Sequence, residues 1–246
     1  MRAGLLGFLF FLSYINLPFS NGLSVIDGSP GLNISDYEGE VEAEWNEKII
    51  FPSAEEMISR NKPYIINVEG IVGTGKSTFL NYMKEYPYFD VLPEPMNKWT
   101  NLNGTDLLGL VFENPSRWSL IQEWSLMYLG GWYNFLNEHL DLTCDLTIYL
   151  RLDPEIAYKR VTERGRTEEN NLSLDFLKRL HRLHDDWLLY RNTSMYLPTQ
   201  NILVIDTSRP LEEMELLYKH LGKKIWKSIP KEMITYCDQL STTEEL

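Results

Sequence analysis

From about residue 61 onward, short apolar runs alternate with longer segments whose apolar residues recur at helical spacing. The short runs are rich in β-branched residues, which is typical of buried strands, and they cover residues 64–69, 91–95, 145–151 and 201–206. The longer segments predict helices over residues 78–84, 105–112, 132–140, 154–164, 174–190 and 211–228. This alternation predicts an α/β fold in which a doubly wound parallel sheet carries helices on both faces.

The turn after the first strand has a distinct pattern. Residues 70–77 read Gly-Ile-Val-Gly-Thr-Gly-Lys-Ser and fit G-x-x-x-x-G-K-[ST] without a substitution. The glycines let backbone N–H groups turn around phosphate oxygens, and the following helix adds partial positive charge at its N-terminus. Lys76 can reach the β- and γ-phosphates, and the Ser77 hydroxyl can bind Mg²⁺. The residues expected to hold a nucleoside triphosphate are Gly70, Gly73, Thr74, Gly75, Lys76, Ser77 and Thr78.

Composition and charge narrow the class of protein. The chain has 246 residues, 43% of them hydrophobic, which suits one α/β domain with extensions. Its formal net charge of −12 argues against a nucleic acid polymer as partner, because such binding needs a basic surface. A nucleotide stays compatible, since it needs only a local positive pocket. Cys144 and Cys237 form neither a metal-binding spacing nor a disulfide framework.

The chain divides into four segments. Residues 1–22 read as a leader that resembles a secretory signal peptide, with an apolar run too short for stable insertion across a membrane. Residues 23–60 are acidic and predict a mostly disordered linker with a short helix near residues 53–57. Residues 61–230 form the predicted domain, and residues 231–246 an acidic tail.

Ionisable groups stand at three further places. Glu94 stands at the carboxyl end of a short strand, and the carboxyl ends of parallel strands face the ligand crevice. Glu94 is therefore a candidate general base, and the alternative is an acid on the protein surface. Arg164 and Arg166 end a helix before a polar loop, and they either close over phosphates or form a solvated face. His181 and His184 share a helix face, but no third ligand completes a metal set, which favours packing.

Together these motifs resemble the deoxynucleoside kinase family, in particular its insect multisubstrate and mitochondrial thymidine kinase branch. Besides the glycine-rich loop, the resemblance rests on four stretches in the expected order. They are Pro-Glu-Pro at 93–95 followed by Trp99, Asn-Pro-Ser-Arg-Trp at 114–118, Arg-Gly-Arg-Thr-Glu-Glu at 164–169, and Leu-His-Arg-Leu-His-Asp-Asp-Trp-Leu at 180–188. The resemblance covers about residues 64–228 and implies a P-loop kinase that transfers a phosphoryl group from ATP to a deoxynucleoside 5′-hydroxyl.

The resemblance also implies catalytic roles. Glu94 matches the general base that takes the proton from the 5′-hydroxyl. Arg164 and Arg166 match the lid arginines that neutralise the transferring phosphoryl group, and Lys76 of the loop is assigned a catalytic role beside them. Asp206 begins the loop that packs near adenine in the family. These roles agree with the chemistry, because phosphoryl transfer depends mainly on positioning and charge stabilisation.

On the nucleoside side, the resemblance assigns three residues besides Glu94. Trp99 matches an aromatic residue that lines the nucleoside pocket, and Glu169 matches the acid that accepts from the sugar 3′-hydroxyl. Phe112 is a departure, because the family commonly has a tyrosine there whose hydroxyl helps hold the 3′-oxygen. Losing that hydrogen bond should weaken substrate binding by about 1 kcal/mol.

A second departure lies between Trp118 and Trp132. The family places there a base-reading helix, a central strand that ends in Asp/Glu-Arg-Ser, and another helix, so about 45 residues are absent. The fold is therefore predicted to lack one central strand, together with an acid that helps hold Mg²⁺ in the family. Residues 123–129 could serve as a short strand; we favour the alternative in which residues 126–136 belong to the helix before the 145–151 strand.

Three functions are compatible with these features. The leading hypothesis is a deoxynucleoside kinase that uses ATP and Mg²⁺. The alternatives are a nucleotide-binding form impaired by the missing segment, and a P-loop kinase that acts on nucleoside monophosphates. The family resemblance also implies a homodimer in the mitochondrion or the cytoplasm, whereas the leader reads as a secretory signal.

Overall fold

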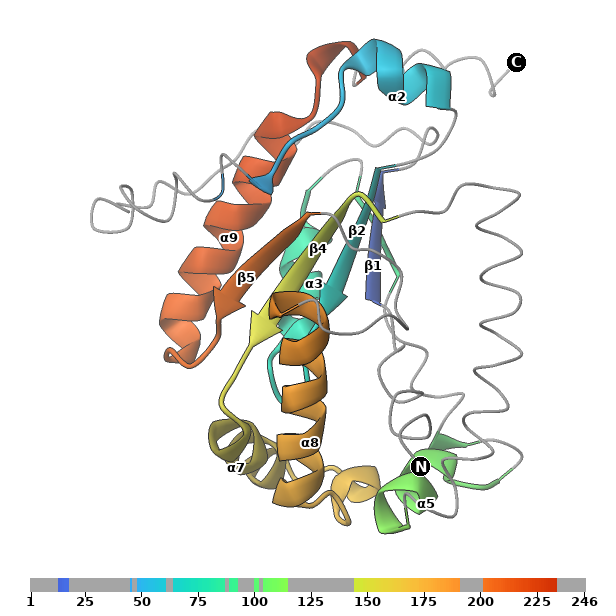
Figure 1. The fold of residues 1–246 in the computed structure, drawn as a ribbon, viewed down its shortest axis with the longest axis vertical. Helices are drawn as coiled ribbons and strands as arrows, with labels where there is room; N and C mark the ends of the chain where they lie inside the picture. The colour runs from blue at the N-terminus through green and yellow to red at the C-terminus, as the bar shows by residue number, and fades with distance from the viewer. Residues whose placement is uncertain are drawn as a thin grey trace.

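We describe the protein from a computed structural model, which places residues 13–17, 45, 48–60, 64–86, 89–92, 100–101, 104–114, 144–190 and 201–233. Strands and helices alternate along most of the chain (Figure 1). The strands are β1 (Ser13–Leu17), β2 (Tyr64–Glu69), β3 (Asp90–Leu92), β4 (Leu146–Arg151) and β5 (Ile202–Asp206). The helices are α2 (Ala54–Arg60), α3 (Lys76–Met83), α5 (Leu107–Glu113), α7 (Pro154–Arg164), α8 (Leu174–His184) and α9 (Leu211–Ser228), with the single turns η2 (Thr167–Glu169) and η3 (Asp185–Leu189).

The sheet has the order β3-β1-β2-β4-β5. β2, β4 and β5 are parallel neighbours, with Val68 beside Ile148 and Ile148 beside Leu203. Each of these strands begins and ends within one residue of the predicted range, because long apolar runs leave little choice of register. The predicted α/β fold with a parallel sheet between helices is therefore confirmed.

The position of β1 was not predicted. Ser13–Leu17 lies between β2 and β3 and runs antiparallel to both, with Ile15 beside Ile66 on one side and Val91 on the other. The sequence places these residues in a leader and predicts a missing central strand at this position. A segment from the predicted leader occupies this position and supplies the ladder hydrogen bonds that β2 and β3 would otherwise lack. The two segments considered for this role, residues 123–129 and 126–136, lie outside the described residues.

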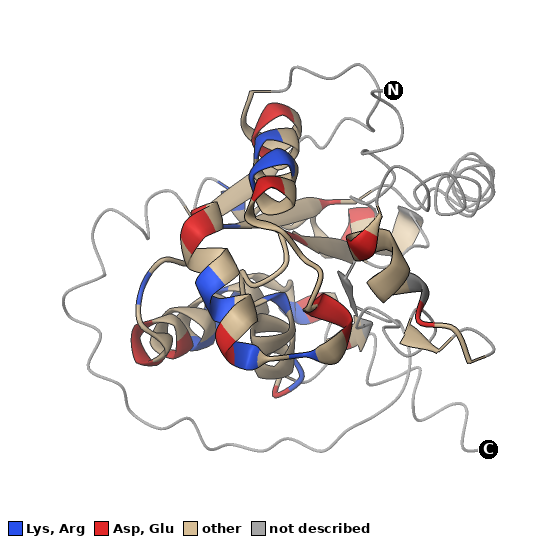
Figure 2. Cartoon of the chain, turned by 90° about the horizontal axis from the view of Figure 1, so that it is seen from below, with Lys and Arg blue, Asp and Glu red and all other residues tan. Residues whose placement is uncertain are grey.

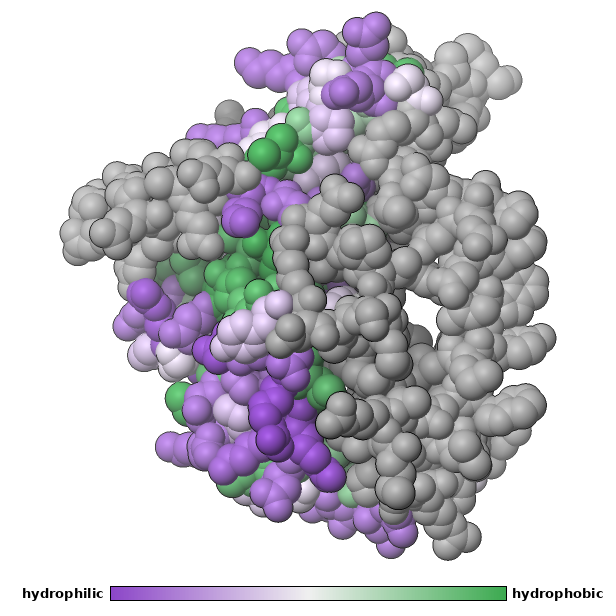
Figure 3. All heavy atoms as spheres, viewed as in Figure 1, coloured by the Kyte–Doolittle hydropathy of each residue, from purple (hydrophilic) through white to green (hydrophobic). Residues whose placement is uncertain are grey.

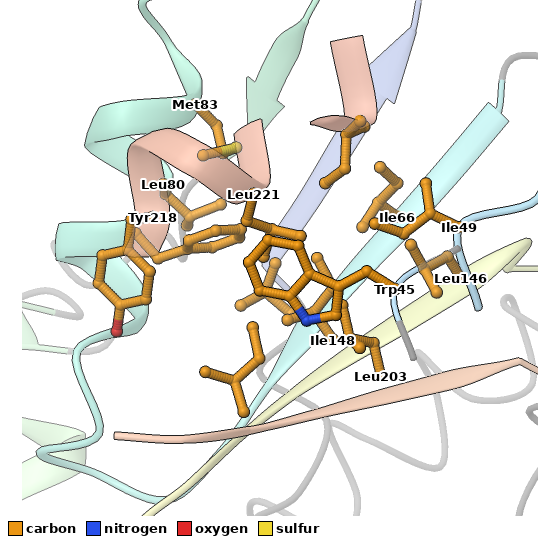
Figure 4. Close-up of a cluster of buried hydrophobic side chains, with 14 of the residues drawn as sticks. Trp45, Ile49, Ile66, Leu80, Met83, Leu146, Ile148, Leu203, Tyr218 and Leu221 are labelled. Carbon is orange, nitrogen blue, oxygen red and sulfur yellow. The ribbon is translucent and has the colours of Figure 1, made fainter. Parts of the chain in front are cut away.

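One face of the sheet is apolar. Alternate residues of β2, β4 and β5 pack there against α3 and α9, and Figure 4 shows the centre of this cluster. Ile66, Ile148 and Leu203 come from the strands, and Leu80 and Leu221 come from the two helices. All five side chains are buried, so this face forms the main hydrophobic core.

The opposite face carries polar residues. Asn67 and Glu69 of β2 lie beside Thr147 and Tyr149 of β4, and all four are buried. Trp187 packs against this face, next to the helix α8 that lies in front of the sheet in Figure 1. A further apolar cluster joins α5, α7 and α8. Figure 3 shows hydrophobic residues beside β5 and α9, whereas α7 and α8 present mostly hydrophilic residues.

Part of the predicted acidic linker packs on the domain. Trp45 is buried in the main core and lies 5.4 Å from His220 of α9, measured between ring centroids. The Tyr64 hydroxyl donates to the Ile50 carbonyl over 3.1 Å. The helix expected near residues 53–57 is α2, whose Ser53 and Glu56 exchange hydrogen bonds at its N-terminus. Apolar residues among the acids therefore bind this segment to the core.

Candidate active site

The loop between β2 and α3 has three glycines with a positive φ, and at two of them an added Cβ would also clash. Gly70 has φ 150°, and a Cβ there would lie 2.6 Å from the Leu150 carbonyl oxygen. Gly73 has φ 92°, and its Cβ would lie 2.9 Å from the Ala157 carbonyl oxygen. The loop therefore packs closely against the neighbouring strand and helix, which keeps its backbone open to a ligand on the other side.

The loop is also held by its own side chains. The Thr74 hydroxyl donates to the Ile71 carbonyl over 2.9 Å, and Thr74 is buried. Lys76 Nζ donates to the carbonyl oxygens of Gly70 over 2.5 Å and Ile71 over 3.2 Å. The ammonium group thus lies within the curve of the loop, and these carbonyls are the acceptors that phosphate oxygens would replace.

Ser77 and Thr78 lie in the first turn of α3, directly after Lys76. Gly75 caps this helix with a backbone φ of 95° and gives it no side-chain hydrogen bond, so backbone N–H groups at this end remain available for phosphate. Ser77 is exposed, as a Mg²⁺ ligand requires. No group of three or more His, Cys, Asp or Glu suited to a metal occurs among the described residues. The exposed Ser77 beside the phosphate-binding turn fits a magnesium ion that would be bound together with the nucleotide.

Three of the predicted site residues, Arg164, Arg166 and Glu169, lie close together. Glu169 of η2 is 6% exposed, and its two carboxylate oxygens accept from Arg164 Nη2 over 2.6 and 2.8 Å. Arg166 Nη1 lies 3.8 Å from the same carboxylate. Gly165 separates the two arginines with φ 65° and ends α7. Figure 2 views this end of the molecule and shows Lys and Arg interspersed with Asp and Glu on its helices.

Two other predicted residues lie on other elements. Phe112 of α5 is buried and meets Phe176 of α8 edge-on, with ring centroids 5.9 Å apart. Its ring therefore makes an apolar contact where the family has a hydroxyl. Asp206 is exposed at the end of β5, where its carboxylate accepts from the Ser208 N–H over 2.9 Å. Glu94 and Trp99 lie outside the described residues.

A network of polar residues, of which Tyr149 and Asp185 are buried, was missed by sequence reasoning. Asp185 Oδ1 accepts from the Tyr149 hydroxyl and from Arg151 Nε, both over 2.9 Å, and Asp185 Oδ2 accepts from Arg151 Nη2 over 2.8 Å. His181 Nε2 lies 3.2 Å from the same carboxylate. Burial alone would raise the pKa of Asp185, but the hydrogen bonds from Arg151 and Tyr149 lower it below its usual range. The network joins β4 to the end of α8.

His184 lies beside this network and is fully buried. Its ring stacks on Tyr149, with centroids 5.8 Å apart and planes at 10°. Burial lowers the pKa of His184 to about 4, so the ring is neutral at physiological pH. His184 thus packs on Tyr149, and His181 contacts Asp185. The one signal in the sequence was the polar pattern His-x-x-His-Asp on an otherwise apolar helix face.

Comparison with known proteins agrees with this geometry. A model of the family "Deoxynucleoside kinase" matches residues 66–129 and 120–230, and the chain belongs to that family. Mitochondrial thymidine kinase 2 of Macaca fascicularis is 27% identical over 220 residues, which cover 71% of this chain and 82% of the relative. Human mitochondrial thymidine kinase 2 is 27% identical over 211 residues, which cover 68% of this chain and 79% of the human protein. Deoxycytidine kinase 1 of Xenopus laevis is 27% identical over 233 residues, which cover 65% of this chain and 88% of the Xenopus protein.

The comparisons also show where the chain differs from its relatives. The two matches to the family model meet at residues 120–129, within the stretch that the sequence predicts to be shortened. The alignment with the Macaca protein is 220 residues long. It includes 71% of the 246 residues of this chain, which is about 175 residues. About 45 residues of the relative therefore have no counterpart, in agreement with the estimate from the motifs.

Proposed function

We propose that this chain transfers the γ-phosphoryl group of Mg-ATP to the 5′-hydroxyl of a deoxynucleoside, giving the 5′-monophosphate and ADP. The observation that carries the proposal is the loop at residues 70–77. Its glycines lie where a Cβ would clash, and Lys76 Nζ donates to the carbonyls inside its curve. Family membership supports the same reaction, because the matched relatives are named as deoxynucleoside kinases.

In this proposal Lys76 leaves the loop carbonyls to bind the β- and γ-phosphates, and Ser77 holds Mg²⁺. The magnesium ion would neutralise charge on the phosphates during transfer. Glu94 takes the proton of the 5′-hydroxyl as the new O–P bond forms and ADP leaves. Arg164 and Arg166 would reach the transferring group once the bond between Arg164 and Glu169 is exchanged for contacts with substrate.

Three further features belong to the proposal. Glu169 would accept from the sugar 3′-hydroxyl, and Trp99 and Phe112 would line the nucleoside pocket. Asp206 begins the loop that would lie near adenine. The deoxynucleoside and ATP are the proposed partners, the chain would pair as a homodimer, and a mitochondrial or cytoplasmic location follows the relatives. No helix among the described residues is long and apolar enough to cross a membrane.

A nucleotide-binding form without turnover is the second candidate, and the direction of β1 favours it. Since β1 is antiparallel to β2, its first residue Ser13 lies opposite Val68, near the start of the loop. A parallel central strand would instead bring its last residues to this edge, where the family has its acid. The magnesium ligand expected from that strand is therefore not supplied by β1.

Turnover and binding can be measured separately. Purified protein should release ADP in the presence of Mg-ATP and either thymidine or deoxycytidine, and it should bind Mg-ATP by calorimetry. The Lys76→Met variant should lose turnover and weaken Mg-ATP binding at least about tenfold. Lys84→Ala, at the end of the same helix, is the matched control and should do neither. Binding without any deoxynucleoside-dependent ADP release would favour the second candidate, and unchanged binding in Lys76→Met would refute the phosphate site itself.

A further inference from the structure

The buried tyrosine Tyr218 of α9 has a hydroxyl group that takes no part in holding the fold together. Tyr218 is 2% exposed, and its ring meets the ring of Phe79 of α3 edge-on, with centroids 5.1 Å apart. Figure 4 shows the hydroxyl oxygen at the margin of the buried cluster, pointing away from the other labelled side chains. The hydroxyl has no hydrogen-bond partner among the described residues. Since buried tyrosines usually pair their hydroxyl groups, this one points to a ligand.

The hydroxyl lies against the phosphate-binding loop. It is 3.3 Å from the position that a Cβ on Gly75 would take. Gly75 caps the N-terminus of α3 and directly precedes Lys76. At this end the first N–H groups of the helix have no partner within the helix, and they attract anions. A phosphate bound here would therefore have the Tyr218 hydroxyl beside it.

A positive charge makes this place favourable for an anion. Arg160 of α7 donates from Nη2 to the carbonyl oxygens of Thr207 over 2.9 Å and Arg209 over 3.1 Å, so the turn after β5 holds its guanidinium group. Burial raises the pKa of Tyr218, and the charge of Arg160 opposes this shift. The hydroxyl is therefore protonated at neutral pH and close enough to Arg160 to be affected by its charge. A protonated hydroxyl beside a cation is suited to donate a hydrogen bond to a phosphate oxygen.

The position of the hydroxyl along the loop indicates which phosphate it would meet. Lys76 Nζ contacts carbonyl oxygens at the start of the loop, where the β- and γ-phosphates are proposed to bind. Tyr218 lies at the other end of the loop, and Arg160 holds the turn that is proposed to lie near adenine. The α-phosphate joins the β-phosphate to the nucleoside, so it would lie between these two regions.

We propose that Tyr218 is a further nucleotide-binding residue, whose hydroxyl donates a hydrogen bond to the α-phosphate of Mg-ATP. The inference rests on the proposed phosphate site at residues 70–77 and adds a residue that lies outside its motif. Because no bond to the α-phosphorus forms or breaks during γ-phosphoryl transfer, the contact is the same in the ground state and in the transition state. Tyr218 therefore contributes to the affinity for ATP rather than to the rate of transfer.

The variant Tyr218→Phe removes the hydroxyl and leaves the packed ring in place. Calorimetry should show Mg-ATP binding at least about tenfold weaker, which is the loss for a hydrogen bond to a charged acceptor. The melting temperature without ligand should stay the same or rise, because the hydroxyl has no partner to lose. A purely structural role predicts the opposite, a lower melting temperature with unchanged affinity. Tyr82→Phe on α3 is the matched control, since the Tyr82 hydroxyl bonds to Glu215 and should not affect Mg-ATP.

A second ligand distinguishes a phosphate contact from a sugar contact. Mg-tripolyphosphate has no sugar, so Tyr218→Phe should weaken its binding by the same factor as the binding of Mg-ATP. Weaker binding of Mg-ATP alone would mean that the hydroxyl contacts the ribose, and it would overturn the assignment to the α-phosphate. Unchanged binding of both ligands would refute the inference and leave the phosphate site of Lys76 standing.

Steady-state kinetics separates the inference from the proposed function. In an active enzyme, Tyr218→Phe should raise the KM for ATP at least about tenfold and keep kcat within about twofold of the wild type. A lower kcat with an unchanged KM would contradict the inference. If the wild type binds Mg-ATP but releases no ADP, the proposed kinase function fails. Weaker binding of Mg-ATP by Tyr218→Phe would still support the role of the hydroxyl in that case.

Discussion

The two faces of the central sheet differ in the kind of side chain that they bury. One face is apolar and forms the main core, and the other is polar and leads to the phosphate-binding loop. On the face towards α3 and α9, the strands contribute apolar residues such as Ile148 and Leu203. On the face towards α8, the same strands contribute Asn67, Glu69 and Tyr149, which are equally buried. The side chains are therefore equally buried on the two faces, but they are apolar on one face and polar on the other.

The difference shows what each face can do. An apolar face stabilises in proportion to the area removed from water and tolerates some repacking. A polar face contributes little net stability, because each hydrogen bond replaces one to water, but its groups have defined directions. The polar face leads directly into the loop at Gly70, because Glu69 is the last residue of β2. Each prediction below tests this division.

Both faces belong to the same sheet, so the largest loss of stability is expected from a change that removes one of its strands. Removal of residues 1–22 deletes β1, which leaves β2 and β3 without the strand that joins them. We expect little folded, soluble protein, as judged by circular dichroism and thermal unfolding. Removal of residues 1–12 retains Ser13–Leu17 and is the matched control. Equal stability of the two truncated chains would show that β1 is dispensable and that the domain begins further along the chain.

On the apolar face, Leu221→Ala should reduce the free energy of unfolding by about 2–5 kcal/mol, because Leu221 is fully buried and the change leaves a cavity. The measurement is urea unfolding at pH 7. Leu216→Ala on the same helix is the control, since Leu216 is 38% exposed and should change the free energy by less than about 1 kcal/mol. The folded fraction of Leu221→Ala should still bind Mg-ATP with wild-type affinity. A large loss of affinity would mean that the two faces are not separable.

The neutral His184 makes the polar face sensitive to acid. Its pKa is lowered from 6.5 to about 4 in the folded chain, so between these values the unfolded chain binds the proton and the folded chain does not. Stability is therefore complete above about pH 7 and falls as the pH drops towards 4, with about 2 kcal/mol lost by pH 5. His184→Gln should flatten this part of the stability profile. A profile as steep as that of the wild type would place the acid sensitivity elsewhere.

Most of the fold was predictable from the sequence, but the polar face was not. The strands at Tyr64–Glu69 and Leu146–Arg151 are long apolar runs, and the helix at Leu211–Ser228 has a clear helical period, so local pattern decides them. The antiparallel strand Ser13–Leu17 could not be predicted, because its apolar residues fit a leader equally well and pairing partners far along the chain decide its state.

The site was predictable where a short motif determines it. The loop at residues 70–77 carries its own backbone requirements, so Gly70 and Lys76 follow from spacing alone. Arg164, Arg166 and Glu169 lie within six residues, so one short turn brings their side chains together. Glu69 and His184 are 115 positions apart, and only the packing of α8 on the sheet brings them into contact. Glu94 and Trp99 stay predictions.

Next to the polar face, Asp185→Ala should reduce the free energy of unfolding by about 1–3 kcal/mol. The change leaves the Tyr149 hydroxyl and the Arg151 guanidinium without their shared acceptor. The lower part of this range is expected for the ion pair itself, since the Arg151 side chain is 42% exposed and water can replace the carboxylate. Asp186→Ala at the next position is the control, with a change below about 0.5 kcal/mol in urea unfolding. Equal effects for the two variants would show that the network does not stabilise the packing of α8.

The smallest effect is expected at Thr147, which lies on the polar face but away from the loop. Its hydroxyl has one contact among the described residues, with Cys144 Sγ at 3.7 Å, which is a weak hydrogen bond. Valine has the same shape, so Thr147→Val should change the free energy of unfolding by less than about 1 kcal/mol, with kcat and Mg-ATP affinity as in the wild type. Thr147 lies beside Asn67 in the register, only one step from Glu69. A loss of kcat or of Mg-ATP affinity in Thr147→Val would show that the polarity of this face, and not the loop at residues 70–77 alone, is needed for the proposed activity.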